Sequence, residues 1–72
     1  MILSKLQRIR IENNLSYQDM ADQLEMTKPS YWMIENGKRK LNYEMAVKIA
    51  SIFGKNPDDI FLRSELTKEE LN

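Results

Sequence analysis

The sequence contains no cysteine and no histidine among its 72 residues. Without cysteine the chain can form no disulfide, no zinc–thiolate site and no thiol nucleophile, and without histidine it has no imidazole general base. Only 2 glycines and 2 prolines are present, which suits helices joined by short turns. No apolar run approaches the length of a membrane span, and the first residues do not resemble a signal peptide. We therefore expect a cytoplasmic protein with no membrane partner.

Charge of neither sign is in excess, because 11 Lys and Arg balance 11 Asp and Glu. The distribution is uneven. Residues 26–40 hold four cations against one acid, a local charge of +3, whereas residues 41–72 hold four cations against six acids, a local charge of −2. Since the local field matters more than the net charge for docking, segment 26–40 remains a candidate for binding an anionic partner.

Apolar residues recur at helical spacing along the chain, and no strand, repeat or linker signal is present. The predicted helix starts share a side-chain acceptor at the N-cap position: Ser16, Thr27, Asn42 and Asn56. The predicted helix ends share Asn or Gly, which tolerate left-handed backbone: Asn13–Asn14, Asn36–Gly37 and Gly54. The sequence thus predicts one small all-α domain of five short helices.

The second and third predicted helices are joined by only Leu24–Met26, and the small Ala21 lets them approach closely, as in a helix-turn-helix. With Leu15-Ser16, Met20-Ala21 and Ile34-Glu35-Asn36-Gly37-Lys38-Arg39, the chain resembles the Cro/C1-type (XRE) helix-turn-helix family. The resemblance continues to Pro57-Asp58-Asp59-Ile60-Phe61. It implies a compact, five-helix, lambda-repressor-like DNA-binding domain over residues 1–62, followed by a tail over residues 63–72 that either frays or extends a dimer contact.

The resemblance also implies a function. Members of this family are usually homodimers that bind a double-stranded DNA operator, with the third helix, about residues 28–36, in the major groove and half-sites ~34 Å apart. They are mostly repressors or activators, often from phages and mobile elements. An enzyme is not expected, because the adjacent pair Asp58–Asp59 opens a helix, where carboxylates stay ionised and exposed. No cofactor, metal or small-molecule substrate is expected.

Tyr31 and Ile34 take the inner face of the third helix, which leaves on its groove-facing side Lys28, Pro29, Trp32, Met33 and Asn36. The first four of these are the candidates for base contacts. Lys28 can donate to a guanine edge or to a phosphate, and Trp32 and Met33 can contact thymine methyl groups. A second reading stays open, in which Trp32 packs on the protein or on a partner and Met33 fills a gap.

Candidates for phosphate contacts lie at helix starts and beside the third helix: Tyr17, Gln18, Thr27, Asn36, Lys38, Arg39, Lys40, Asn42 and Tyr43. The basic run that follows Gly37 is favoured for this role over the alternative of a solvated turn. Tyr17 stands where the family usually has Gln, and its hydroxyl can still donate to a phosphate.

Two structural expectations come from the resemblance. Arg10 and Glu35 are expected to form a partly buried, bidentate ion pair that ties the first helix to the end of the third. Glu25 stands where the family usually has a left-handed Gly, so either this residue accepts about 1 kcal/mol of strain or the turn differs.

By resemblance, the dimer contact lies around the fifth helix: Asn56, Pro57, Asp58, Ile60, Phe61 and Leu62. Ile60 and Phe61 could instead close the core of the monomer. A different function also stays open: a protein-binding helix-turn-helix module of antitoxin or antirepressor type, using an exposed face with Trp32 and Met33.

Overall fold

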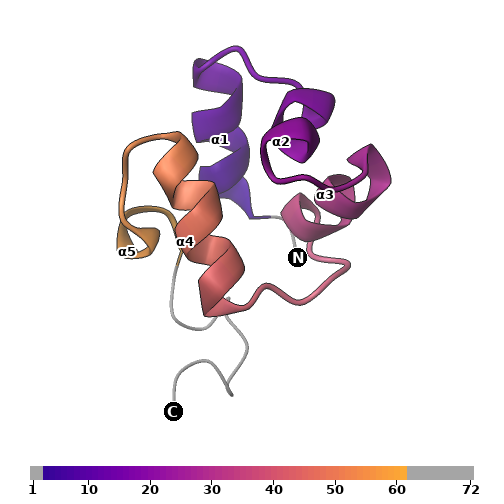
Figure 1. The fold of residues 1–72 in the computed structure, drawn as a ribbon. Helices are drawn as coiled ribbons and strands as arrows, with labels where there is room; N and C mark the ends of the chain where they lie inside the picture. The colour runs from indigo at the N-terminus through magenta and orange to yellow at the C-terminus, as the bar shows by residue number, and fades with distance from the viewer. Residues whose placement is uncertain (1–2, 62–72) are drawn as a thin grey trace. The chain divides into compact units, whose positions relative to one another are not determined.

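The computed structural model describes residues 3–61, and over that range the chain forms five helices and no strand, which confirms the all-α prediction (Figure 1). The helices are α1 (Ser4–Glu12), α2 (Tyr17–Gln23), α3 (Lys28–Glu35), α4 (Tyr43–Ile52) and α5 (Pro57–Ile60). The chain divides into two compact units, Met1–Arg39 with α1 to α3, and Lys40–Asn72 with α4 and α5. The predicted tail over residues 63–72 lies outside the described residues.

Helix starts follow the predicted caps. Ser16 and Asp19 form a capping box on α2: the Ser16 hydroxyl accepts from the Asp19 amide at 3.0 Å, and the Asp19 carboxylate accepts from the Ser16 amide at 2.8 Å. This second bond lowers the pKa of Asp19 below its usual value. The other predicted N-cap residues also stand directly before their helices: Thr27, Asn42 and Asn56.

The first four helices end in the same way, with one residue of positive φ just beyond the C-cap. These residues are Asn14, Glu25, Gly37 and Gly54, with φ of 57°, 57°, 72° and 66°. At the end of α2, the Met26 amide donates to the Ala21 carbonyl at 2.9 Å, and the Glu25 amide donates to that of Asp22 at 3.2 Å. This is the Schellman pattern. Glu25 therefore accepts the left-handed conformation that the family usually gives to Gly.

Replacing Glu25 by Gly should stabilise the protein. Removing left-handed strain gains about 1–2 kcal/mol, and the extra chain entropy of Gly costs about 0.5–1 kcal/mol, so the expected gain is about 0.5–1 kcal/mol. Urea unfolding followed by circular dichroism measures it. Glu25→Ala is the matched control, because it removes the same side chain and keeps the strain. Equal stability of the two variants would show that the turn is not strained.

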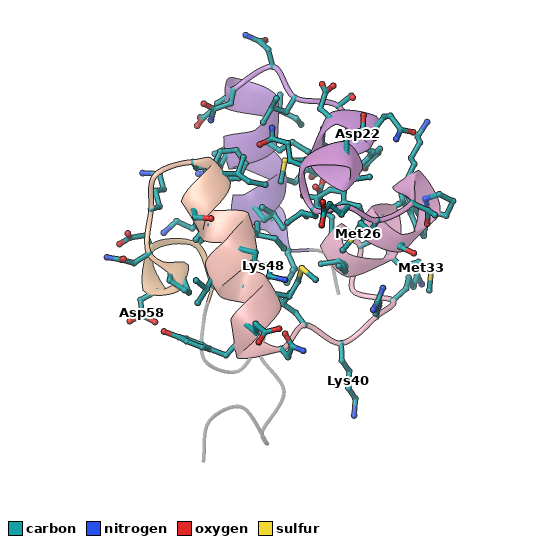
Figure 2. All side chains as sticks on the ribbon, viewed as in Figure 1. Asp22, Met26, Met33, Lys40, Lys48 and Asp58 are labelled. Atoms are coloured by element: carbon teal, nitrogen blue, oxygen red, sulfur yellow. The ribbon has the colours of Figure 1, made fainter. Side chains whose placement is uncertain are left out.

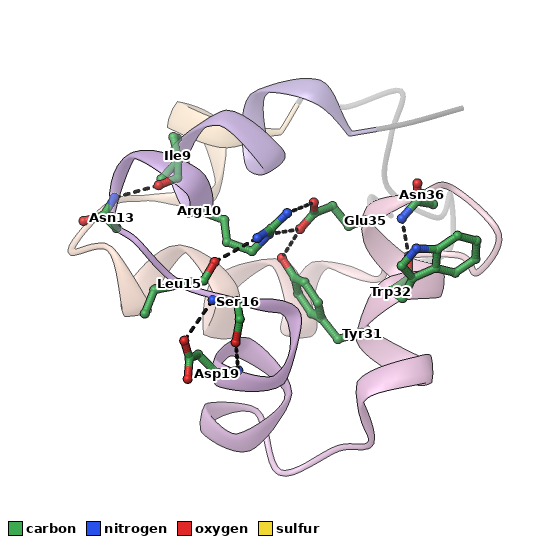
Figure 3. Close-up of polar contacts among 10 residues, drawn as sticks. All are labelled: Ile9, Arg10, Asn13, Leu15, Ser16, Asp19, Tyr31, Trp32, Glu35 and Asn36. Atoms are coloured by element: carbon green, nitrogen blue, oxygen red, sulfur yellow. Dashed lines mark hydrogen bonds and ion pairs between the residues drawn. The ribbon is translucent and has the colours of Figure 1, made fainter.

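A buried carboxylate organises the first unit. Glu35 in α3 is 0 % exposed, and both of its carboxylate oxygens accept hydrogen bonds from side chains (Figure 3). Arg10 of α1 donates from Nε to Oε2 at 2.8 Å and from Nη2 to Oε1 at 2.9 Å, and the Tyr31 hydroxyl donates to Oε2 at 2.7 Å. The backbone carbonyl of Glu35 also accepts from the Leu3 amide at 2.8 Å. Glu35 thus joins the start and the end of α1 to α3.

The guanidinium of Arg10 has further partners. Its Nη1 donates to the Leu15 carbonyl at 2.8 Å, and its Cζ lies 4.3 Å from the centroid of the Tyr17 ring, within cation–π range. The hydrogen bond with Glu35 raises the pKa of Arg10. Burial, followed by the bond to Glu35, raises the pKa of Tyr31. Arg10 therefore stays charged and Tyr31 stays neutral, as this arrangement requires.

Each unit has buried apolar side chains that pack between its helices. In the first unit α3 packs against both α1 and α2, and the buried apolar residues are Leu3, Leu6, Ile9, Met20, Ala21, Tyr31 and Ile34. In the second unit α4 packs against α5, and the buried residues are Leu41, Ala46, Ile49, Ala50, Ile60 and Phe61.

Breaking the Arg10–Glu35 pair from one side should cost more than removing both charges. Arg10→Met leaves a buried, uncompensated carboxylate and should lower the free energy of unfolding by about 3–5 kcal/mol. Adding Glu35→Gln should recover part of that loss, because an amide is cheaper to bury than an unpaired charge. The free energies of unfolding of both single variants and the double variant in urea, with a stabilising osmolyte present, measure the coupling. Strict additivity of the two single effects would refute it.

Candidate functional site

Helices α2 and α3 form a helix–turn–helix in the first unit (Figure 1). Ala21 in α2 is fully buried, and its small side chain permits the close approach of α3. The turn folds back onto Ala21 through the amide of Met26. Thr27 then begins α3: its hydroxyl accepts from the Ser30 amide at 3.3 Å and donates to the Ser30 hydroxyl at 2.9 Å. The direction of α3 is thereby fixed at its first turn.

The outer face of α3 is apolar and exposed. Tyr31, Ile34 and Glu35 occupy its buried side, and the four candidates for base contacts are exposed: Lys28, Pro29, Trp32 and Met33. Trp32 is 41 % exposed and Met33 is 39 % exposed. Figure 2 shows the Met33 side chain projecting away from the helix. The structure therefore does not bury these two side chains in the chain's own core.

Positive charge follows directly after α3. The Met33 carbonyl accepts from the Lys38 amide at 2.8 Å and from the Arg39 amide at 3.2 Å, so the backbone of both residues is bonded to the last turn of α3. Their side chains are exposed, as is that of Lys40, which Figure 2 shows extending away from the chain. Among residues 3–61, none of these cations forms an ion pair. Cations at this position also interact favourably with the negative, C-terminal end of the α3 dipole.

Several candidates for phosphate contacts already have partners within the chain. Gln18 donates to Asp22 at 2.8 Å, and Asn36 donates one amide hydrogen to the Trp32 carbonyl at 2.9 Å. Thr27 uses its hydroxyl as the cap of α3. The half-buried ring of Tyr17 stacks on Arg10, so this residue supports the ion pair where the family usually has Gln. Among residues 3–61, the side chains of Lys38 and Arg39 form no hydrogen bond or ion pair, and the hydroxyl of Tyr17 forms no hydrogen bond.

The second unit holds the remaining candidates. Asn42 caps α4 by accepting from the Met45 amide at 2.8 Å, and Tyr43, the first residue of α4, is exposed. The candidates for the dimer contact, in and around α5, differ in exposure. Asn56 and Asp58 are exposed and Pro57 is half-buried, whereas Ile60 and Phe61 are buried within the single chain. Leu62 lies outside the described residues.

Three contributors to the Arg10 cluster were not foreseen from the sequence: the hydroxyl of Tyr31, the ring of Tyr17 and the carbonyl of Leu15. One of them had a sequence signal. Tyr31 and Glu35 are four residues apart, so they lie on the same face of a helix and can bond.

Within residues 3–61 no group of three or more acidic, cysteine or histidine side chains is placed to hold a metal ion. In the same range no helix is both long and apolar enough to span a membrane.

Comparison with known proteins gives matches to helix-turn-helix proteins. A family model described as helix-turn-helix matches residues 6–60. The chain is 36 % identical over 59 residues to the uncharacterized HTH-type transcriptional regulator MJ0272 of Methanocaldococcus jannaschii, covering 82 % of this chain and 89 % of that protein. It is 35 % identical over 52 residues to the uncharacterized HTH-type transcriptional regulator YqaE of Bacillus subtilis, covering 72 % of this chain and 45 % of that protein. No solved structure matches with comparable significance.

Proposed function

Because the chain belongs to the Cro/C1-type (XRE) helix-turn-helix family, a family of DNA-binding regulators and not of enzymes, we propose that it is a homodimeric, phage- or mobile-element-like repressor. It binds a specific double-stranded DNA operator in the cytoplasm. The observation that carries the proposal is the exposed outer face of α3, with a cation at its start and two more fixed at its end.

The face of α3 suits the major groove. That groove is about 12 Å wide and admits one α-helix, whose side chains then meet the base edges. Lys28 at the first turn can donate to guanine, and Trp32 and Met33, about one turn later, can contact the bases. The opposite side of α3 is occupied by the core and the buried Glu35.

Lys38 and Arg39 suit the DNA backbone. Their backbone amides are bonded to the last turn of α3, so a helix that enters the groove carries these side chains to the phosphates beside it. Cations that neutralise phosphates release counterions, and this makes the affinity fall as salt rises. These contacts position the protein and carry no sequence information.

A dimer would place one copy of α3 on each half of a pseudo-palindromic operator, with half-sites about one helical turn, ~34 Å, apart. The contact is self-complementary and is proposed around the start of α5, at the exposed Asn56 and Asp58 and the half-buried Pro57. Little of Ile60 or Phe61 is available to a second copy, because both side chains are buried.

The alternative is a protein-binding module of antitoxin or antirepressor type. The specific observation in its favour is the exposure of Trp32 and Met33, because adjacent exposed apolar side chains often mark a protein contact. The two functions differ in their response to salt. DNA binding weakens steeply as salt rises, whereas an apolar protein contact responds little.

A binding selection on random double-stranded DNA, carried out at two salt concentrations, tests the proposal. We expect a pseudo-palindromic motif whose affinity falls with salt on a slope of about −0.9 for each phosphate contacted. A folded protein that enriches no motif would refute operator binding and favour the protein-binding module.

Two substitutions separate base contacts from phosphate contacts on the selected operator. Lys28→Ala should cost about 1–3 kcal/mol and relax the preference at one base position. Arg39→Ala should weaken all sequences alike and reduce the salt slope by about one. Repeating the selection with each variant, together with salt titrations, measures both effects. The assignment of roles fails if the two variants change the sequence preference equally.

A further inference from the structure

We infer that this protein reads its operator mainly through the 5-methyl groups of thymine, which Trp32 and Met33 contact in the major groove. The inference rests on the proposed function, and it assigns the chemistry by which the bases are recognised.

The exposed side chains of α3 limit how this helix can recognise bases. Its exposed side chains are an ammonium group, a pyrrolidine ring, an indole and a thioether: Lys28, Pro29, Trp32 and Met33. Apart from the ammonium group of Lys28 and the carboxamide of the half-buried Asn36, the face has none of the groups that usually form paired hydrogen bonds with adenine, guanine or cytosine. Asn36 uses one of its amide hydrogens on the Trp32 carbonyl, and Thr27 uses its hydroxyl to cap the helix.

The major groove of DNA offers an apolar match for such a face. The thymine methyl group is the apolar feature of the standard base pairs on the major-groove side. Trp32 and Met33 are 41 % and 39 % exposed, so each has apolar surface left to bury against a methyl group.

The charges around this face favour DNA as its occupant. Lys28 is exposed at the start of α3, and Lys38 and Arg39 are bonded through their backbone to the Met33 carbonyl. An apolar strip flanked by cations complements a groove with apolar methyl groups on its floor and phosphates along its rims. The contacts are also ordered along the helix. Lys28 and Trp32 are separated by about 6 Å of helix rise, so a guanine read by Lys28 should lie about two base pairs from the thymines.

The test replaces thymine by uracil in the selected operator, one position at a time. Uracil keeps the base pairing and the O4 acceptor and lacks only the methyl group. At each contacted thymine we expect affinity to fall about four-fold, the amount associated with burial of one methyl-sized group. Fluorescence anisotropy at fixed salt gives the ratio of the dissociation constants of the uracil and thymine duplexes.

Protein variants assign the effect to residues. In Trp32→Ala or Met33→Ala the uracil-to-thymine ratio should return to about one at the position that the side chain contacts. Arg39→Ala should weaken both duplexes and leave the ratio unchanged. Ile11→Ala in α1 and Val47→Ala in α4 are matched controls, because Ile11 and Val47 are also exposed apolar residues, 58 % and 40 %, and lie outside α3. Neither control should change the ratio.

The outcomes distinguish this inference from the proposed function. Specific binding with a ratio of one at every thymine would overturn methyl reading and leave operator binding intact. A ratio that persists in both Trp32→Ala and Met33→Ala would assign the reading to other residues and overturn the inference. Absence of any specific DNA binding would overturn the proposed function and this inference with it. The comparison on the unmodified protein needs no variant, so it stands even if a substitution prevents folding.

Discussion

The buried carboxylate of Glu35 is the constraint around which the first unit is arranged. An ionised group without exposure to water is tolerated only when it is paired and hydrogen-bonded, and here Arg10 and Tyr31 meet that requirement. Because Arg10 also bonds to the Leu15 carbonyl and lies over Tyr17, one guanidinium links α1, the connection that follows it, the start of α2, and α3. The orientation of α3 therefore depends on a polar cluster as well as on apolar burial.

Local signals made much of the fold predictable. The N-caps Ser16, Thr27 and Asn42 act through bonds to amides three residues ahead, so short stretches of sequence suffice to identify them. Helix ends were predictable where Asn or Gly takes positive φ. Glu25 has the same conformation without that signal, because the Schellman bonds around it hold the turn.

Tertiary relations were harder to predict. The helical period showed that Tyr31 faces inward, but not that its hydroxyl bonds to Glu35. The apolar pattern could not decide between core and interface for Ile60 and Phe61, since both roles require the same kind of side chain, and only the packed chain shows them buried. At the candidate site, the outer face of α3 was predictable from the period. The internal bonds of Gln18 and Asn36 were not predicted, although each joins residues four apart in the sequence.

The interleaving of two kinds of residue along α3 has an evolutionary consequence. Tyr31, Ile34 and Glu35 hold the helix in place, while Pro29, Trp32 and Met33 alternate with them on the outside, and no side chain of the outer three forms a hydrogen bond with another described residue. Surface positions of this kind usually change at little cost in stability. Paralogues could therefore diverge in target preference by drifting at the outer positions alone, and one scaffold could give rise to regulators that do not interfere with one another.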